Sequence, residues 1–372
     1  MVIIYGVRGV AQSGRVLALG ARCRRFESCR PDHTLPRLRV VDHKFKPAKW
    51  SVLFCHGYNG LFRLTRNLDG RILNPLKEDT MSIDYTLHTH TIGFDGRNTP
   101  NEMILAARAA GLKTIGFSNH FIVHPGIKKS QMYKYAVRGG YANIYSDNVE
   151  YTISCFDAHY REIRALRDKY PDMNILCGME MDWFRYPGWC DTVNYAVTRL
   201  NPDYIIGAMH FIDRNANGIL NVHDIKNAPG AESRRLLREY YQNLIRLAEF
   251  DWRRLGFRFN WIAHFDLPRR VGLHFPEMEQ GALDAIGQNG MPIELNTALI
   301  YNKNYGGPDE RQKIMKQIAA ADVPVLVSDD AHDVNRLGAD FDEVQCLADT
   351  AKIQKLCMRA ETLKNMLDVR VR

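Results

Sequence analysis

The feature that most constrains the fold is a regular alternation of short apolar segments with amphipathic segments, which begins near residue 84. The apolar segments have the length of buried strands, and the amphipathic ones have the apolar spacing of helices. The expected strands are residues 84–90, 113–120, 174–180, 204–210, 261–264, 291–296 and 323–332. Strands and helices that alternate in one continuous series predict a parallel sheet, here an α/β fold with a closed barrel of seven strands.

Helices are expected between these strands. The first has a capping box formed by Thr99 and Glu102, carries Pro100 at its first position and stops at Gly111. The others are expected near residues 151–169, 192–200, 232–249, 277–288 and 310–320, with one more after residue 340. A long insertion with several tyrosines separates the second strand from its helix.

Composition limits the class of protein. The chain has 372 residues, 45% of them hydrophobic, which is enough for a large buried core. No apolar run reaches the roughly 18 residues of a membrane span, and Arg8 and Arg15 interrupt the segment that a signal peptide would occupy. The eight cysteines are scattered without a C-x-x-C pair, so most are expected to be reduced thiols. We therefore expect a cytoplasmic protein without a membrane partner.

The formal net charge of +8 is concentrated in the first eighty residues. Residues 1–80 contain fifteen Lys and Arg against six Asp and Glu, which leaves 35 against 36 in residues 81–372. The body of the chain is therefore near neutral, and its charge does not support a nucleic-acid partner.

Residues 1–80 also lack a sustained helical or strand period and carry basic, turn-prone clusters. The segment from Gly9 to Ser28 resembles a conceptual translation of a bacterial transfer-RNA gene, because its Arg-Phe-Glu-Ser ending back-translates to the T-arm consensus. We interpret residues 1–80 as a disordered or spurious extension, with Met81 as the expected start and 81–372 as the functional domain. The alternative is a genuine basic N-terminal arm.

Metal-ligating side chains fall where the expected strands end. Six of the ten histidines after Met81 do so: His88, His90, His120, His210, His264 and His332. The other four lie elsewhere: His124, His159, His223 and His274. In β/α barrels the C-terminal ends of the strands carry the chemistry. Six imidazoles at one barrel mouth, together with Asp95, Glu180 and Asp330, would form an uncompensated polar cluster unless metal ions filled it. The sequence therefore predicts a metal centre.

These side chains lie in motifs that recur in order along residues 82–350. The motifs are His88-Thr-His90-Thr with Asp95-Gly96, Phe117-Ser-Asn-His120, Gly178-Met-Glu180, Asp203-Tyr-Ile-Ile-Gly-Ala-Met-His210, Ile262-Ala-His264-Phe-Asp266-Leu-Pro268, Glu294-Leu-Asn296-Thr297 and Ser328-Asp-Asp330-Ala-His332. Their order and spacing resemble the PHP (polymerase and histidinol phosphatase) superfamily, and most of all its histidinol-phosphate phosphatases.

The resemblance implies a distorted, TIM-like (βα)7 barrel with two to three divalent metal ions at its mouth. It implies one ion on His88, His90, Glu180 and Asp330, a second on Glu180 as a bridge with His210 and His264, and a third on Asp95, His120 and His332. A metal-bridging water held among Glu180, His210, His264 and Asp330 would be the nucleophile. Mixed imidazole and carboxylate ligands suit zinc, manganese or iron.

The expected substrate is a small phosphomonoester, because clustered divalent ions position a phosphate and neutralise charge on its oxygens. Arg269 and Arg270 are candidate phosphate ligands, since arginine matches phosphate geometry with paired donors. Asp182, Asp266 and the tyrosine-rich insertion are candidates for binding the ammonium and imidazole groups of histidinol. The expected function is a metal-dependent phosphatase, specifically L-histidinol-phosphate phosphatase of histidine biosynthesis. Two alternatives stay open, a phosphatase for a nucleotide or sugar phosphate and a non-catalytic metal-binding domain. The sequence sets no oligomeric state.

Three positions depart from the family pattern. Asn119 stands where many members have an aspartate. Asp329 precedes Asp330, and the Asp-x-His spacing selects Asp330 as the ligand, which leaves Asp329 a supporting or solvated role. Relatives often carry a basic residue soon after the Asn-Thr of the sixth strand, but Thr297 is followed by Ala-Leu-Ile-Tyr. The last departure concerns the substrate more than the chemistry.

We predict that residues 81–372 suffice for folding and activity. A chain that begins at Met81 should be soluble, unfold cooperatively and hydrolyse the same phosphomonoester as the full chain, because residues 1–80 show no pattern of a folded unit. Thermal unfolding and steady-state kinetics of both chains test this. An insoluble or inactive short chain beside an active full chain would contradict it.

Overall fold

The structure is a computed structural model that describes residues 52–57, 60–66, 72–73, 83–214, 218–353 and 367. The chain divides into two units, Met1–Thr80 and Met81–Arg372. In the first unit, β1 (Val52–Gly57), β2 (Gly60–Arg66) and β3 (Ile72–Leu73) form an antiparallel sheet, which the sequence analysis did not predict. The interpretation of residues 1–80 as an extension lies mostly outside the described residues and stays a prediction.

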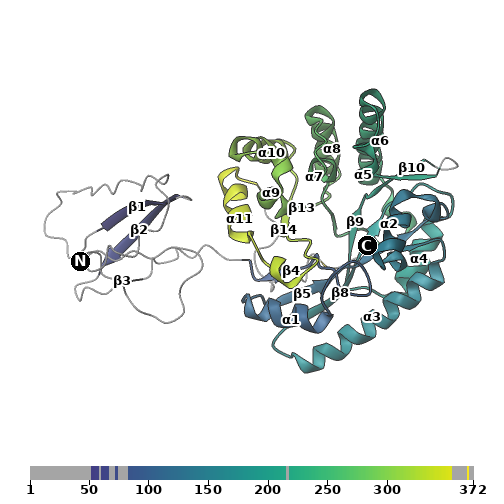
Figure 1. Cartoon of the computed structure of the whole chain (residues 1–372), viewed down its shortest axis with the longest axis horizontal. Helices are drawn as coiled ribbons and strands as arrows, with labels where there is room; N and C mark the ends of the chain where they lie inside the picture. The colour runs from purple at the N-terminus through teal and green to yellow at the C-terminus, as the bar shows by residue number, and fades with distance from the viewer. Residues whose placement is uncertain are drawn as a thin grey trace. The chain divides into compact units, whose positions relative to one another are not determined.

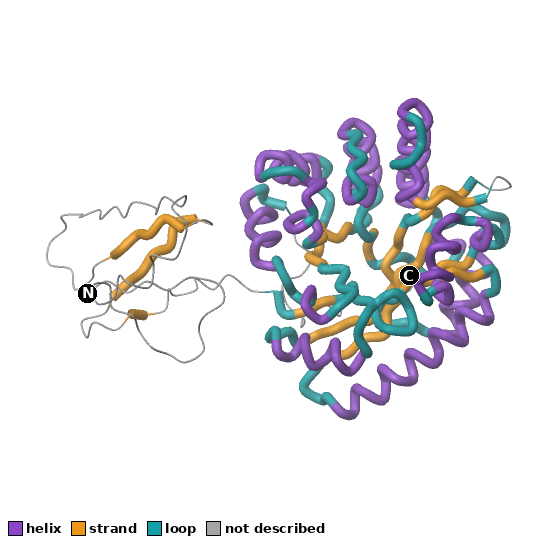
Figure 2. The backbone as a smooth tube through the Cα atoms, in the orientation of Figure 1, coloured by secondary structure: helices purple, strands orange, loops and turns teal. Residues whose placement is uncertain are grey.

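Seven parallel strands form the continuous path of the barrel sheet in the second unit, and their order in the sheet follows their order in the chain, while β6 and β7 attach to this sheet through β8. They are β4 (Tyr85–Thr86), β5 (Thr114–Phe117), β8 (Asn174–Asp182), β9 (Tyr204–Ala208), β12 (Trp261–Ile262), β13 (Ile293–Asn296) and β14 (Val325–Ser328). Figures 1 and 2 show the strands inside and the helices around them. The predicted seven-stranded β/α barrel is confirmed.

The first and last strands meet beyond their C-terminal ends. Thr89 and Ala331 form a parallel bridge, in which the N–H of His90 donates to the carbonyl of Ala331 and the N–H of Ala331 donates to the carbonyl of His88, both at 2.9 Å. The barrel is therefore nearly closed, and the segments that carry the first and last histidine motifs lie side by side.

The larger helices separate the strands as predicted. They are α1 (Pro100–Ala109), α3 (Val149–Lys169), α4 (Trp189–Leu200), α6 (Gly230–Ala248), α8 (Pro276–Gln288) and α10 (Pro308–Ala320), with α11 (Phe341–Thr350) after the last strand. The predicted capping box is present at α1, where the Thr99 hydroxyl accepts from the N–H of Glu102 and the Glu102 carboxylate accepts from the N–H of Thr99.

Shorter elements follow the C-terminal ends of the barrel strands. The tyrosine-rich insertion contains β6 (His120–Val123), η2 (Ile127–Lys129), α2 (Gln131–Gly139), η3 (Ala142–Ile144) and β7 (Tyr145–Ser146). Later strands are followed by β10 (Phe211–Asp213), β11 (Ile219–Asn221), α5 (Val222–Ile225), α7 (Leu267–Arg270), α9 (Ala298–Tyr301), η6 (Lys303–Tyr305) and η7 (Val334–Arg336). One more short helix, η5 (Trp252–Arg254), lies between α6 and β12 instead. Several of these additions build up the mouth of the barrel, where β/α barrels carry their functional sites.

Tyr204 fills the barrel interior beneath this mouth. It is fully buried, its ring stacks on Trp261 with the centroids 5.4 Å apart, and its hydroxyl donates to the carbonyl of Leu87 at 2.5 Å. Gly116 and Gly178 face the same ring, and a Cβ at either position would lie only 2.2 or 2.1 Å from the Tyr204 side chain. The two glycines therefore provide the space that the ring occupies, and the layer below the mouth is densely packed.

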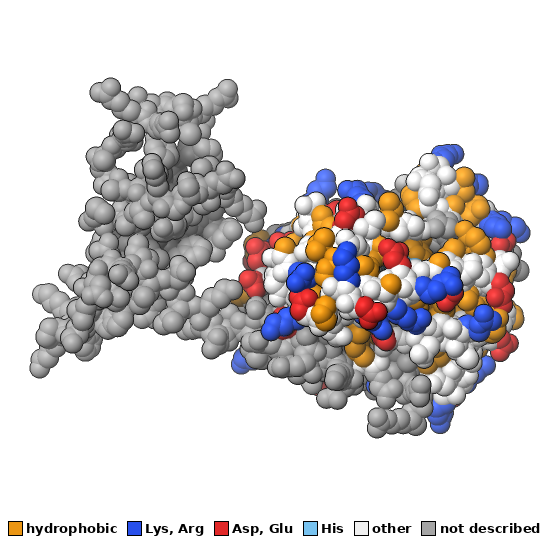
Figure 3. Space-filling view, turned by 90° about the horizontal axis from the view of Figure 1, so that it is seen from below, with side chains coloured by type: hydrophobic (Ala, Val, Ile, Leu, Met, Phe, Trp, Pro, Cys, Tyr) orange, Lys and Arg blue, Asp and Glu red, His pale blue; other side chains and the backbone are white. Residues whose placement is uncertain are grey.

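The surface agrees with the near-neutral charge of residues 81–372. On the face drawn in Figure 3, basic and acidic side chains are interspersed. Within the described ranges, no helix combines the length and the apolar character that crossing a bilayer requires.

We predict that Gly178→Ala destabilises the barrel. The new methyl group would overlap the Tyr204 ring, and such overpacking costs about 3 kcal/mol of unfolding free energy. Gly281→Ala is the control, because a Cβ there meets no described atom within 4 Å and alanine in α8 should stabilise by about 0.5–1 kcal/mol. Urea unfolding of both variants measures the two effects, and an equal response would refute the packing argument.

Candidate metal centre

The structure brings all nine predicted ligands together at the C-terminal ends of the strands. They form four overlapping groups in which one nitrogen or oxygen per residue lies within 4.8 Å of the others: His90, Asp95, His120 and His332; His88, His90 and Glu180; His88, His264 and Asp330; His120, Glu180 and His210. Each group offers at least three donors to a single ion, which is the minimum for a protein metal site with open positions.

Glu180 lies at the centre of the cluster and is fully buried. Its Oε1 is 2.8 Å from His264 Nε2 and 3.5 Å from His210 Nε2, and its Oε2 is 2.6 Å from His120 Nδ1 and 3.4 Å from His88 Nε2. Burial alone raises the pKa of Glu180, but the facing imidazoles outweigh burial and hold the pKa well below its ordinary value. An ionised carboxylate with imidazoles at both oxygens is placed to bridge two cations.

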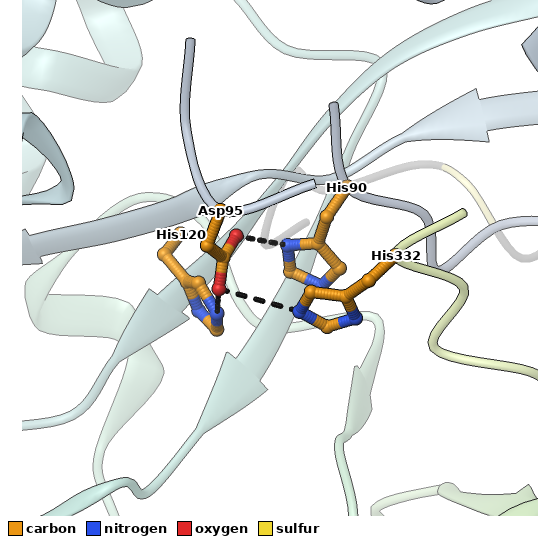
Figure 4. Close-up of side chains that lie close together, drawn as sticks. All are labelled: His90, Asp95, His120 and His332. Carbon is orange, nitrogen blue, oxygen red and sulfur yellow. Dashed lines mark hydrogen bonds and ion pairs between the residues drawn. The ribbon is translucent and has the colours of Figure 1, made fainter. Parts of the chain in front are cut away.

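Asp95 organises a second group of side chains from three segments (Figure 4). Its Oδ2 lies 3.1 Å from His120 Nε2 and 3.3 Å from His332 Nε2, and its Oδ1 lies 3.3 Å from His90 Nδ1. The His90 and His332 rings stack with their centroids 4.1 Å apart. The four side chains point toward one another and enclose a common space.

Asp330 connects this group to His88. Its Oδ1 lies 3.1 Å from His90 Nε2 and 3.5 Å from His88 Nε2, while its Oδ2 accepts from Arg270 Nη1 at 2.7 Å. Both Asp330, with φ of 50°, and His264, with φ of 20°, have a positive φ that is costly for residues other than glycine. Such strain is typical of functional positions, where the surrounding structure imposes the conformation.

Several donor atoms of the cluster have the properties of metal ligands. Among the described residues, His88 Nε2, both ring nitrogens of His90, Asp95 Oδ1, His120 Nδ1 and Glu180 Oε2 are buried and face one another without a hydrogen bond of standard geometry. Buried polar atoms without partners are costly. Burial lowers the pKa of His88, but nearby carboxylates raise it more, so its pKa lies well above the ordinary value. The carboxylates thus favour positive charge here, and these residues fit a site for divalent metal ions.

Two buried carboxylates orient histidines of the cluster from behind. Glu294 accepts from His88 Nδ1 at 2.7 Å and from the N–H of His264 at 3.1 Å. Asp182 accepts from the N–H and the Nδ1 of His210, both at 2.8 Å. A carboxylate on one ring nitrogen leaves the other nitrogen free to face an ion. Asp182 therefore supports His210 in this structure, and its role as a substrate ligand stays a prediction.

Sequence reasoning quoted Glu294 within a motif but did not include it among the site residues. The available signal was a carboxylate in the otherwise apolar start of a barrel strand, Ile293–Asn296.

The two candidate phosphate arginines point to different places. Arg269 is buried away from the cluster, where its guanidinium forms a bidentate pair with Glu279 of α8. The structure thus shows a structural contact for Arg269, and its role in phosphate binding stays a prediction. Arg270 lies at the cluster beside Asp330, and its Nε and Nη2 are buried without a hydrogen-bond partner of standard geometry among the described residues. Asp266 is buried next to Arg270, and burial raises its pKa.

Asp329 has a supporting role and is not solvated. Its carboxylate is 1% exposed and accepts from the Thr86 hydroxyl at 2.6 Å and from the N–H of Gly338 at 2.8 Å. Burial raises its pKa to about 6. Asp329 therefore ties the last strand to the first, while its neighbour Asp330 faces the cluster.

A β/α barrel whose strand ends carry clustered imidazoles and carboxylates is typical of one class of metal-binding α/β proteins. The chain belongs to the PHP domain family, whose family model matches residues 84–298.

Two comparisons illustrate the relationship. A probable histidinol-phosphatase of Schizosaccharomyces pombe (strain 972) is 23% identical over 222 residues, which cover 55% of this chain and 68% of that protein. The crystal structure of histidinol phosphate phosphatase from Lactococcus lactis subsp. lactis, complexed with zinc, L-histidinol and phosphate, superimposes with a TM-score of 0.54 at 16% identity. That match covers 74% of this chain and 96% of the Lactococcus chain, and it establishes the shared fold.

We predict that Arg269→Met lowers the free energy of unfolding by about 3–5 kcal/mol, because it leaves Glu279 buried and unpaired. The double variant Arg269→Met with Glu279→Leu should recover part of that loss, since it removes both charges. Denaturant unfolding measures both. A loss below about 1 kcal/mol, together with weaker inhibition by inorganic phosphate, would instead return Arg269 to the phosphate site.

Proposed function

We propose that the chain is a metal-dependent phosphomonoester hydrolase, and that L-histidinol phosphate is its substrate. The observation that carries the proposal is the set of nine ligand side chains, in which seven surround the fully buried Glu180 and the partly buried Asp95, with Arg270 at the edge of the set. The family membership and the histidinol-phosphatase relatives support the same reaction class.

The residues would hold two to three divalent ions, of zinc, manganese or iron. His88, His90, Glu180 and Asp330 would hold one ion. Glu180 would share a second with His210 and His264, and the third would lie among Asp95, His120 and His332. Bound ions of this kind supply a water of lowered pKa and neutralise charge on phosphate oxygens.

The chain's own contribution to phosphate binding centres on Arg270. Asp330 fixes one end of its guanidinium at 2.7 Å and leaves buried Nε and Nη2 donors at the mouth. Two such donors match two phosphate oxygens, and a guanidinium held in advance loses little freedom on binding. Arg270 would therefore orient the phosphate and stabilise the negative charge of its oxygens during attack.

The leaving group is the less constrained part of the proposal. Histidinol carries an ammonium and an imidazole, and Asp266 and the buried Tyr145 of the insertion lie near the cluster to receive them. The alternative is a phosphomonoester with another leaving group, such as a nucleotide. This alternative is favoured by Tyr301, which follows the sixth strand and is 51% exposed. Relatives often carry a basic residue in this segment.

The test compares substrates and metals in one experiment. The kcat/KM for histidinol phosphate should exceed that for p-nitrophenyl phosphate and a nucleoside monophosphate by about a hundredfold, because contacts made only by the true substrate lower its barrier. Chelator treatment should abolish turnover, and divalent metal should restore it.

Ligand variants are the controls. His90→Ala and Asp330→Ala should lose metal and turnover while the barrel stays folded. Activity in metal-free protein would refute the hydrolase proposal, whereas preference for the nucleotide would refute only the substrate.

A further inference from the structure

His159 is a buried histidine that the proposed reaction does not use. It lies on α3, is 7% exposed, and packs edge-on against Phe94 and Phe117 at centroid distances of 5.4 and 6.0 Å. Burial lowers its pKa to about 4, so the ring is neutral at neutral pH. A neutral imidazole has one N–H donor and one acceptor nitrogen, and what each contacts decides the tautomer.

The contact that decides the tautomer is with Asn119. Asn119 Oδ1 accepts from the backbone N–H of Thr91 at 2.8 Å, which identifies this atom as the oxygen, because an N–H donor requires an acceptor. The Nδ2 group must then face His159 Nε2 at 2.8 Å and the Thr91 hydroxyl at 3.0 Å. Because Nδ2 can only donate, His159 Nε2 must be the acceptor, and the ring proton must lie on Nδ1.

These bonds join the segments that carry three candidate ligands. Thr91 directly follows His90, and Asn119 directly precedes His120. The backbone carbonyl of Asn119 also accepts from the N–H of Glu180 at 3.0 Å. Thr91 and Asn119 are fully buried, so water does not compete for these bonds.

Asn119 also explains why a neutral histidine fits here. An aspartate at this position could still accept from the N–H of Thr91, but its second oxygen would face His159 Nε2 with no proton between them. His159 would then have to move its proton from Nδ1 to Nε2, or bind a second proton in an apolar pocket. The amide supplies that proton itself and keeps the bonded unit uncharged.

We propose that His159 is a positioning residue for the group formed by His90, Asp95, His120 and His332: through Asn119 and Thr91 it fixes the backbone that aims His90 and His120 at their ion. The inference rests on the proposed metal-dependent function. His159 touches neither substrate nor metal in this role, and acts only through the amide that it receives.

The first test measures metal affinity in the full chain. His159→Phe fills the space but removes the acceptor, so zinc titrated against a chromophoric chelator should show one site weakened about tenfold to hundredfold. His159→Gln, which offers an acceptor oxygen, should retain more of the affinity. Tyr160→Phe is the matched control. Tyr160 lies on the same helix as His159, and the change deletes its buried hydrogen bond to the carbonyl of Gly178 but leaves the Asn119 contacts intact.

The second test does not depend on metal. Histidine-labelled protein should show His159 in the neutral Nδ1–H tautomer by nitrogen-15 NMR, and Asn119→Asp should place a proton on Nε2, either as the neutral Nε2–H tautomer or as the protonated ring. An Nε2–H tautomer in the wild type would overturn the inference, as would unchanged zinc affinity in both His159 variants. If His159→Phe does not fold, the tautomer measurement on the wild type decides the inference by itself. A wild-type chain that binds no zinc would refute the proposed function, while the tautomer would still decide the role of His159.

Discussion

The structure of the barrel mouth depends on keeping the Glu180 carboxylate ionised where it is fully buried. Removing a carboxylate from water costs several kcal/mol unless cations or strong donors face it. Imidazoles from four other strand ends, those of β4, β5, β9 and β12, surround its two oxygens. The Thr89–Ala331 bridge brings the last strand, which carries Asp330, beside the first of these four. Closure of the barrel and assembly of the site are therefore the same structural event.

Most of the fold could be predicted because one pattern repeats along the chain. Parallel strands present all their C-terminal ends at one edge, so ligands at the ends of six of the seven strands predict both the barrel and the convergence of the nine side chains. The β10–β11 hairpin was missed, because the three-residue runs Phe211–Asp213 and Ile219–Asn221 are too short for a period-two pattern to stand out. The antiparallel strands of the first unit were missed as well.

The residues around the ligands were harder to predict, because their roles depend on direction. Arg269 and Arg270 are adjacent on the short helix α7, and one residue turns a helix by about 100°, so one side chain points to Glu279 and the other to Asp330. The contact between Asp182 and His210 depends on the register of β8 with β9, which the sequence does not reveal, so Asp182 was assigned to the substrate instead. Composition and spacing carry no information on either point.

The departures from the family pattern differ in what they change. Asn119 is matched by a neutral His159, so the substitution preserves a fully bonded support for the ligands.

The basic residue that relatives often carry after the sixth strand is replaced here by the apolar segment after Thr297, and no nearby side chain among the described residues makes up for it in the same way. The nearby Arg336 donates to Thr297 and Asp340 and lies 3.8 Å from the centre of the Tyr301 ring, so much of its donor capacity is already used. A guanidinium under the ring also makes the Tyr301 face less attractive to a cation and more suited to a neutral or electron-rich ring. The ligand-bearing strand ends thus agree with the family, whereas the rim beside Tyr301 is the part of the mouth that departs from it, and it is there that the proposed choice of leaving group would depend on residues specific to this chain.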